Sequence, residues 1–337
     1  MKSMSPLPAD LITFLRGTDL IDADEVPAAR PLTGGVSSDI WLVETARGPV
    51  CVKRALSQLK VAQDWRAPVE RNAYEVQWFR AARAYVPEAV PSILAHDEVA
   101  GAFAMEYLDP DHFRVWKEEL RHGRVDFDVA AQVGSTLARI HAGTAGDAEV
   151  EGSFQTDDLF HALRLEPYLE ATARVHTDLG DELMALSQAT LATKIALVHG
   201  DVSPKNILIG RDGPVLLDAE CAWYGDPAFD LAFCLNHLLL KCLWVPASFP
   251  DLLQTFAILT QAYLSGVTWE PPEDLEARTA RLLPALFLAR VDGKSPVEYL
   301  TNDNEKNRVR SATRALLVDP ADTLEDVAMA WTRELSS

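Results

Sequence analysis

Residues 197–220, LVHGDVSPKNILIGRDGPVLLDAE, place carboxylate and amide side chains at short intervals between apolar runs. Asp201 could accept a proton from a hydroxyl group, and Asn206 and Asp218 offer the hard oxygen ligands that Mg²⁺ prefers. Glu220 would add a fourth oxygen donor on the same side if its segment is extended, because it follows Asp218 by two residues. Such a set suits phosphoryl transfer, where catalysis is mostly positioning and neutralisation of charge on the phosphates.

Two short strands are expected to position these side chains. The apolar runs KNILIG and GPVLLDA flank the residues RDG at 211–213, which are typical of a tight hairpin turn. A loop next to this hairpin would be a rigid platform, with Asp201, Asn206 and Asp218 at its mouth. The alternative is a turn in which the Asp and Asn side chains only satisfy backbone groups.

The compound pattern of His199-Gly200-Asp201, Asn206 and Asp218 resembles the aminoglycoside phosphotransferase and choline kinase family, whose members have a protein-kinase-like fold. The spacing from the Asp to the Asn matches the catalytic loop of that family, and Asp218 follows where the family has a metal-binding Asp. The resemblance implies a small-molecule kinase with ATP as co-substrate, Mg²⁺ as cofactor and a hydroxyl-bearing acceptor. It implies Asp201 as the catalytic base and Asn206 and Asp218 as metal ligands.

The stretch TGGVSSDIWLVET, residues 33–45, resembles the loop that covers the nucleotide in this family. Gly34 and Gly35 would let backbone amides approach the phosphates, and Ser37 would lie near the tip of the loop. The alternative is an ordinary turn, in which pairs of glycines are common.

The next strands are expected to bind the rest of the nucleotide. Lys53 occupies the strand position where the family has the lysine that holds the α- and β-phosphates; otherwise it is an exposed strand lysine. Glu70 and Glu75 are both close enough along the chain to orient it, but they cannot share a helical face, and the resemblance favours Glu75. The backbone near Glu106 and Leu108 would bind adenine, unless this segment is only a core strand.

The segment after Asp218 bears on the acceptor. Its Asp-x-Glu pair and the following aromatic-Tyr-Gly resemble the methylthioribose kinases, in which both acids approach the metals, so Glu220 is a further expected Mg²⁺ ligand. The alternative for Glu220 is a carboxylate at the rim of the site. Those kinases have a different residue where this chain has Asn206. A sugar, an aminoglycoside and an amino alcohol therefore all stay open as acceptors, with a methylthioribose-like sugar slightly favoured.

Four residues are candidates for contact with the acceptor. Trp223 and Tyr224 could cover a sugar face or hold an ammonium group through cation–π attraction, and the alternative for both is core packing. Asp226 could hydrogen-bond an acceptor hydroxyl or amine. Arg290 lies near a helix break at Gly293, where polar side chains can line a pocket; the alternative is a plain surface turn.

Two further residues resemble structural positions of the family. Asp230 corresponds to the Asp that ties down the catalytic loop through backbone amides. His141 ends a helix that packs beneath this loop in the family, which implies a structural histidine rather than a ligand.

The sequence pattern changes near residue 108 from short β-type runs to helical periodicity, which predicts an α+β, bilobal protein-kinase-like fold. The expected division is a small β-rich nucleotide-binding lobe over 1–107, a hinge at about 105–109, and a helical lobe with the catalytic loop and acceptor site over 108–337. Asp126 is a plausible N-cap for a helix that begins at Phe127. Later helices are expected at 182–193, 227–242, 251–265, 272–290, 305–317 and 322–335.

The composition of the chain limits the classes of partner that it is expected to bind. The 337 residues include 50 acidic and 31 basic ones, and the formal charge of −19 disfavours nucleic acid and anionic membranes as partners. The four cysteines lack the spacing of a zinc site or a disulfide framework. Polar residues interrupt both the N-terminal apolar stretch and the apolar run at 231–247, so neither a signal peptide nor a membrane span is expected, and the expected location is the cytoplasm.

Two other functions compete with a small-molecule kinase. A protein kinase is disfavoured because the chain has no His-Arg-Asp, no DFG and no APE motif. A catalytically silent nucleotide sensor would be expected to lack at least one of the acids, yet Asp201 and Asp218 are both present.

Overall fold

The structure, a computed structural model, describes residues 6–32, 38–56 and 70–337. The chain divides into two units, Met1–Phe113 and Arg114–Ser337. The first unit contains most of the residues in strands, and the second contains most of the helices.

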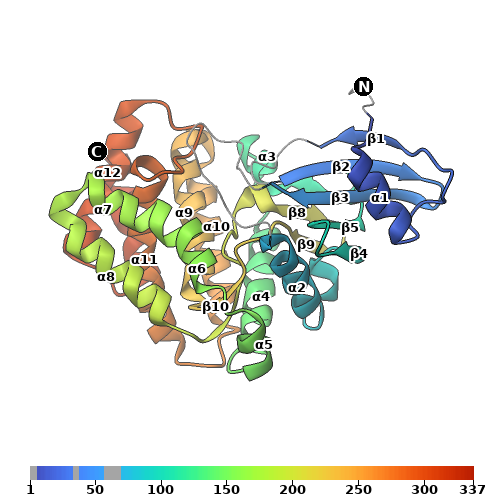
Figure 1. The fold of residues 1–337 in the computed structure, drawn as a ribbon. Helices are drawn as coiled ribbons and strands as arrows, with labels where there is room; N and C mark the ends of the chain where they lie inside the picture. The colour runs from blue at the N-terminus through green and yellow to red at the C-terminus, as the bar shows by residue number, and fades with distance from the viewer. Residues whose placement is uncertain (1–5, 33–37, 57–69) are drawn as a thin grey trace. The chain divides into compact units, whose positions relative to one another are not determined.

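Unit 1 is built on a five-stranded antiparallel sheet with the strand order β1-β2-β3-β5-β4 (Figure 1). Successive side chains of a strand point to opposite faces, so each strand contributes side chains to both faces of the sheet. Val50 and Val52 of β3 pack with Leu11 and Phe14 of helix α1 on one face. The bounds of these elements are α1 Ala9–Gly17, β1 Ala28–Pro31, β2 Ser38–Thr45, β3 Gly48–Ala55, β4 Ile93–Asp97 and β5 Ala102–Glu106.

The intervening residues of the same strands meet helix α2, Arg71–Arg83. Phe103 of β5 lies edge-on to Phe79 of α2, with ring centroids 6.5 Å apart, and Lys53 of β3 reaches Glu75 of α2. The alternation of the strands therefore places Lys53 on the face of the sheet opposite to α1.

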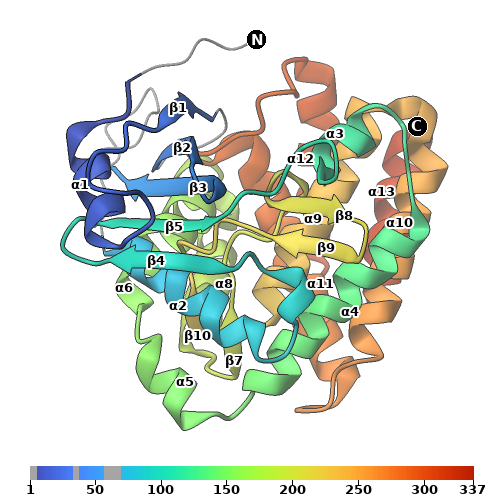
Figure 2. The same cartoon turned by 90° about the vertical axis from the view of Figure 1, so that its right-hand side faces the viewer.

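Unit 2 contains two small groups of strands. β7 (Ala196–Val198) pairs with β10 (Trp223–Gly225), and β8 (Ile207–Gly210) pairs with β9 (Gly213–Leu216) and β6 (Arg114–Val115) (Figure 2). The pairing of Gly210 with Gly213 leaves a two-residue turn at 211–212, as predicted. Because β10 returns to pair with β7, the residues that follow the hairpin lie beside the residues that precede it.

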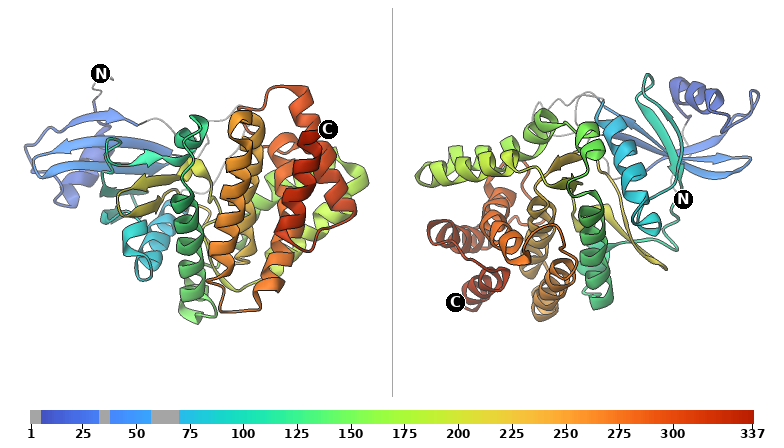
Figure 3. Two further views of the ribbon diagram at one scale, coloured as in Figure 1. Left: turned by 180° about the vertical axis from the view of Figure 1, so that it is seen from behind. Right: turned by 90° about the horizontal axis from the view of Figure 1, so that it is seen from below.

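Helices surround these strands. Helix α4 packs along α10, and the buried α9 packs against α10 and α11 (Figure 3). The helices of unit 2 are α3 Trp116–Arg121, α4 Phe127–Thr144, α5 Ala148–Ser153, α6 Asp157–Phe160, η2 His161–Glu170, α7 Ala171–Val175, α8 Gly180–Ala192, α9 Ala228–Trp244, α10 Phe249–Leu264, α11 Pro272–Asp292, α12 Asp303–Val318 and α13 Leu324–Ser336.

The predicted helices are present, with ends that differ by two residues at most. Asp126 caps α4, because its side chain accepts hydrogen bonds from the backbone N–H groups of Asp128 and Val129. The short helices between residues 148 and 175 were not predicted, and one of them, η2, is a π-helix with Pro167 inside.

No single helix in the described ranges is long and apolar enough to cross a membrane. The helices α9 and α10 satisfy the criteria of length and composition only when counted together, and they meet at a bend of 118°.

Candidate active site

The catalytic loop predicted from the sequence begins where β7 ends, and its backbone turns at Gly200. Gly200 has φ +79°, a conformation that glycine adopts readily and other residues avoid. A Cβ at this position would lie 2.7 Å from the carbonyl oxygen of Cys221. Both the backbone conformation and the close approach require glycine here, and the turn presents the next residue, Asp201.

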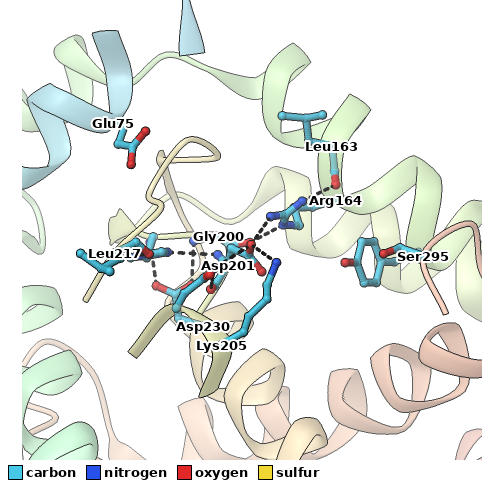
Figure 4. A network of polar contacts seen from close by, with 12 residues as sticks. Glu75, Leu163, Arg164, Gly200, Asp201, Lys205, Leu217, Asp230 and Ser295 are labelled. Carbon is cyan, nitrogen blue, oxygen red and sulfur yellow. Dashed lines mark hydrogen bonds and ion pairs between the residues drawn. The ribbon is translucent and has the colours of Figure 1, made fainter. Parts of the chain in front are cut away.

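Asp230, in the first turn of α9, holds this loop by its backbone. Its Oδ2 accepts a hydrogen bond from the N–H of His199 at 2.7 Å, and its Oδ1 accepts one from the N–H of Gly200 at 2.8 Å (Figure 4). His141 of α4 lies 3.3 Å from Oδ2 through Nε2 and 2.7 Å from the Tyr263 hydroxyl through Nδ1. All of these side chains are buried. Asp230 thus contacts two backbone amides of the loop, and His141 lies in the interior beside it.

The His199 imidazole joins the loop to the end of the hairpin. Its Nδ1 accepts a hydrogen bond from the N–H of Asp201 at 3.2 Å, and its Nε2 lies 3.1 Å from the carbonyl oxygen of Leu217. A carbonyl oxygen only accepts, so Nε2 carries the proton and the ring is neutral. Burial lowers the pKa of His199, which favours the same neutral form. His199 thereby fixes the position of Asp218, the residue after Leu217, relative to the loop.

One oxygen of the Asp201 carboxylate receives three donors. The Oδ2 atom lies 2.9 Å from Nδ2 of Asn206, 3.1 Å from Nη2 of Arg164 and 3.2 Å from Nζ of Lys205 (Figure 4). Within the described residues, no hydrogen bond is recorded to Oδ1. The carboxylate is thus fixed through Oδ2, and Oδ1 is the oxygen that can accept a proton from another molecule.

Arg164 is a functional candidate that the sequence did not reveal. It lies on the π-helix η2 and is buried; its Nε donates to the carbonyl oxygen of Gly200, and its Nη1 donates to that of Leu163 at 2.7 Å. It therefore contacts both the backbone and the carboxylate of the catalytic loop. A π-turn changes the direction of side chains relative to an α-helix, and such turns are frequent at functional sites. The only signal in the sequence was Pro167, three residues after a lone arginine.

Asn206 is oriented by the same carboxylate. Its Nδ2 donates to the backbone carbonyl of Asp201 at 3.0 Å as well as to Oδ2, and both partners are acceptors. The amide nitrogen must face them, so the amide oxygen points the other way. This orientation leaves Oδ1 of Asn206 in position to serve as a ligand.

The acids of the predicted set lie within electrostatic range of one another. The Asp201 carboxylate, followed by that of Asp218, raises the pKa of Lys205, whose side chain is half-exposed. Arg164 interacts in the same way with Asp201 and Glu220. Asp218 has φ +69°, a strained conformation for a residue other than glycine that clusters at functional sites. Asp201, Asp218 and Glu220 therefore gather at one place in unit 2.

The proximity of these acids does not amount to a preformed metal site. No group of three His, Cys, Asp or Glu side chains in the described part of the chain is arranged to hold a metal ion. The oxygen donors of Asn206 and Asp218 fit Mg²⁺ in type, since this ion prefers one or two carboxylates completed by water and substrate phosphates.

In unit 1, Lys53 and Glu75 form a buried ion pair. Nζ of Lys53 lies 2.8 Å from Oε1 and 2.7 Å from Oε2 of Glu75, and the two side chains are 3% and 2% exposed. Glu75, the favoured candidate, is thus a partner of Lys53, whereas Glu70 is exposed just before α2.

The contacts of the other predicted nucleotide-binding residues are less well defined. Glu106 uses its side chain to accept from the N–H of Ser92 at 2.7 Å, and Leu108 is half-buried just after β5. The predicted residues Gly34, Gly35 and Ser37 lie outside the described residues.

The prediction that Trp223 and Tyr224 cover the acceptor is not supported by the structure. Trp223 is fully buried, with Phe160 stacked on its ring at 4.1 Å and Nζ of Lys194 4.3 Å from its centroid. The Tyr224 hydroxyl donates to the carbonyl of Ile195 at 2.7 Å and accepts from a backbone N–H at 2.8 Å. Both rings belong to the core, the alternative that the sequence left open.

The Asp226 carboxylate likewise binds groups of the protein itself. Its carboxylate binds the guanidinium of Arg278 at 3.1 and 3.2 Å and accepts from the N–H of Ala228 at 3.0 Å. Burial raises the pKa of Asp226, and Arg278 opposes that rise. Asp226 therefore stabilises the start of α9 rather than offering a free carboxylate to an acceptor.

Arg290, the fourth candidate, lies at the end of α11 and is buried. Its Nη1 donates to the Ser295 hydroxyl at 3.0 Å, to the Ser295 carbonyl and to the Tyr168 hydroxyl at 3.2 Å. The polar residues after the helix break thus orient Arg290 in the interior of unit 2, and they do not form a plain surface turn.

Two curated relatives of this chain are methylthioribose kinases. The chain is 26% identical over 226 residues to the methylthioribose kinase of Pectobacterium atrosepticum, which covers 58% of this chain and 55% of the relative. It is 23% identical over 268 residues to methylthioribose kinase 1 of Oryza sativa subsp. japonica, with coverages of 69% and 61%. The chain thus spans less than two thirds of the length of these relatives.

Solved structures show the fold. The macrolide 2′-phosphotransferase of Brachybacterium faecium superposes with a TM-score of 0.51 at 19% identity, over 93% of this chain and 99% of that one. The ethanolamine kinase of Plasmodium vivax superposes with a TM-score of 0.53 at 13% identity, over 97% and 87%. The predicted α+β, protein-kinase-like fold is confirmed.

The model of the phosphotransferase enzyme family matches residues 28–256, which include the strands of unit 1, the catalytic loop and the first half of α10. This match covers more than half of the chain, and the chain therefore belongs to the phosphotransferase enzyme family.

Proposed function

We propose that the chain is an ATP- and Mg²⁺-dependent small-molecule kinase that transfers the γ-phosphate to a hydroxyl group of a sugar-like acceptor. The observation that carries this proposal is the Asp201 carboxylate, held through Oδ2 by Arg164, Lys205 and Asn206 on a loop that Asp230 clamps.

In this proposal Asp201 is the catalytic base. Its Oδ1 orients the acceptor hydroxyl and takes its proton as the oxygen attacks the γ-phosphorus. The three donors on Oδ2 prevent rotation of the carboxylate, so the accepting oxygen is in position before the acceptor binds. Lys205 extends from the same loop, and its half-exposed ammonium group would stabilise charge on the transferred phosphoryl group.

Asn206, Asp218 and Glu220 would hold Mg²⁺ through their side-chain oxygens. The ion would neutralise charge on the phosphates when it is bound. The outward orientation of the Asn206 amide oxygen and the electrostatic proximity of Asp218 to Asp201 support this assignment.

Lys53 would bind the α- and β-phosphates of ATP, with Glu75 holding its ammonium group in place. The predicted roles of Gly34, Gly35 and Ser37 in covering the phosphates, and of the backbone near Glu106 and Leu108 in binding adenine, remain part of the proposal. A methylthioribose-like sugar is favoured as acceptor because curated relatives are named methylthioribose kinases.

A screen for ADP release tests the proposal. The protein would be incubated with ATP and Mg²⁺ and with methylthioribose, other pentoses, choline, ethanolamine or an aminoglycoside. We expect ADP release that requires both an acceptor and the metal. Asp218→Asn should lose roughly a hundredfold in turnover, as expected when a charge-stabilising group is removed, whereas Asp212→Asn on the exposed hairpin turn should leave turnover unchanged.

Two results would favour the competing functions. Calorimetry that shows Mg²⁺-dependent ATP binding, without turnover on any acceptor, would favour a nucleotide sensor. Phosphate incorporation into casein or a peptide mixture, but into no small molecule, would favour a protein kinase.

A further inference from the structure

One face of helix α9 leads from the catalytic loop to a group of cations. Asp230, Phe233, His237, Lys241 and Trp244 follow one another at steps of three or four residues, so they lie along one side of the helix. Asp230 holds the catalytic loop at the start of this face. His237 lies about 10 Å further along the axis, since a helix rises about 1.5 Å per residue.

The far part of this face forms what we call the cationic cluster, composed of Lys117, His237, Lys241 and Arg290 with the rings of Trp244 and Tyr299. The two rings stack with centroids 4.3 Å apart. Nζ of Lys241 lies 5.2 and 5.1 Å from these centroids, and Nζ of Lys117 lies 5.8 and 5.7 Å from them. Aromatic faces attract both ammonium groups, but they supply no negative charge.

The cationic cluster has more positive than negative groups. Lys117 pairs with Glu298. Lys241 is 1% exposed, and within the described residues no ion pair to a carboxylate is recorded for it. Buried lysine is rare unless it is paired, because removing its charge from water is costly. The cluster therefore has an unbalanced buried cation in a chain whose formal charge is −19.

Two buried nitrogen atoms in the cationic cluster also lack partners. Nε2 of His237 and Nε of Arg290 are buried without a hydrogen bond to any group in the described part of the chain. His237 and Arg290 are 6% and 8% exposed. Buried polar atoms are nearly always hydrogen-bonded, and exceptions mark strain, function or an absent partner. Unpaired nitrogen atoms beside an unpaired ammonium group indicate a ligand with negatively charged oxygens.

The surroundings of Lys241 are consistent with such a ligand. Burial, together with the charges of Lys117 and Arg290, lowers the pKa of Lys241 to about 7, and Glu298 and Cys234 oppose the shift. An oxyanion against Nζ would favour the charged form of Lys241.

The cationic cluster is continuous with Asp201. Lys205, whose Nζ lies 3.2 Å from Oδ2 of Asp201, interacts electrostatically with His237. Arg290 donates to the Tyr168 hydroxyl, and the guanidinium of Arg164 lies 5.9 Å from the Tyr168 ring. Asp201 and the cationic cluster are thus linked by an electrostatic interaction through Lys205 and by contacts through Tyr168 and Arg164 within unit 2.

We propose that the phosphate acceptor is an anionic hydroxyl compound of the size of a sugar acid or a sugar phosphate. Its carboxylate or phosphate binds Lys241, His237 and Arg290, and its hydroxyl meets Asp201. This inference rests on the proposed kinase function and changes its favoured acceptor from a neutral methylthioribose-like sugar to an anionic sugar derivative. Choline, ethanolamine and aminoglycosides carry positive charge and would be repelled.

Ligand-induced thermal stabilisation tests the inference without requiring turnover. The melting temperature of the full chain would be measured with ribonate, ribose 5-phosphate, neutral ribitol or cationic ethanolamine. A ligand that binds only the folded state raises the melting temperature, and we expect a rise of about 2 °C or more with at least one of the two anions and none with ribitol or ethanolamine. A response to ribonate alone identifies a carboxylate ligand, and one to ribose 5-phosphate alone a phosphate ligand.

Variants separate this inference from the proposed function. Lys241→Met should abolish the response to the anions, and the variant itself should fold at least as stably, because methionine replaces a buried charge by an apolar chain of similar length. Lys306→Met on α12 removes a charge outside the cationic cluster and should keep the response. Asp201→Asn should keep the response while losing turnover.

The outcomes are distinct. A response to ribitol or ethanolamine that equals or exceeds the response to the anions overturns the inference, and so does the absence of any response to both anions. An anion response that persists in Lys241→Met overturns it as well. If the anions raise the melting temperature but no acceptor is phosphorylated, the proposed kinase function is contradicted and the anion site is not.

Discussion

Replacing Gly200 by alanine is expected to disrupt the catalytic loop through two separate effects. Alanine at φ +79° costs about 1–2 kcal/mol, because its Cβ crowds the backbone in the left-handed region. The added Cβ would also lie 2.7 Å from the carbonyl oxygen and 2.9 Å from the Cβ of Cys221. Overpacking of this kind costs about 1–3 kcal/mol. We therefore expect the free energy of unfolding to fall by about 2–5 kcal/mol.

The clash should also affect turnover, because Asp201 follows Gly200 directly. If the loop moves to relieve the contact with Cys221, the carboxylate moves with it, and a displacement of about 1 Å can cost a hundredfold in rate. Urea denaturation would measure the stability, and ADP release under conditions where the variant is folded would measure the turnover.

Gly146→Ala is the matched control for this prediction. Gly146 has φ +70°, but a Cβ there would meet nothing within 4 Å, so this variant should lose only the conformational part, about 1–2 kcal/mol, and keep its turnover. Equal effects of the two substitutions, or a Gly200→Ala protein with normal stability and turnover, would refute the reasoning from close contact.

Three further predictions follow from buried charges. Asp230→Asn should lower the free energy of unfolding by about 2–4 kcal/mol in urea denaturation, because an amide N–H would replace an acceptor of the loop N–H groups; an unchanged midpoint would contradict this. Lys53→Met should cost about 3–5 kcal/mol by removing the cation that pairs with the buried Glu75 carboxylate, whereas Lys53→Met with Glu75→Leu should recover most of that stability but not ATP affinity in calorimetry; a double variant no more stable than the single one would contradict it. The pKa of Lys241 is about 7 when folded and about 10.4 when unfolded, so the unfolded state binds more protons between these values. The contribution of Lys241 to stability should therefore rise with pH across that window, which the difference in unfolding free energy between wild type and Lys241→Met at pH 7 and pH 9.5 would show; a difference independent of pH would contradict it.

The catalytic loop could be predicted from the sequence because its chemistry is local. Asp201, Asn206 and Asp218 flank one hairpin, so their spacing indicated their convergence, and family membership is confirmed. The choice of Glu75 over Glu70 came from the resemblance to the family, since helical periodicity showed only that the two residues cannot share a face.

Features that depend on long-range packing could not be predicted in this way. Arg164 reaches Asp201 from a π-helix, and the spacing of hydrophobic residues in the sequence does not predict a π-helix. Trp223 and Tyr224 follow Asp218 and Glu220 closely in the sequence, but both side chains are buried in the core where β10 pairs with β7. Whether an aromatic side chain faces a ligand or the interior is decided by neighbours far away in the chain, such as Phe160 and Ile195.

Asp201→Asn, measured for ATP binding and for single-turnover phosphate transfer with an acceptor found by the ADP-release screen, tests the central claim most directly. Asparagine keeps the size of the side chain but cannot take the proton from the acceptor hydroxyl. We expect the rate of transfer to fall roughly a hundredfold or more, while Mg²⁺·ATP affinity stays close to that of the wild type. Transfer at the wild-type rate in this variant would contradict the assignment of Asp201 as the base.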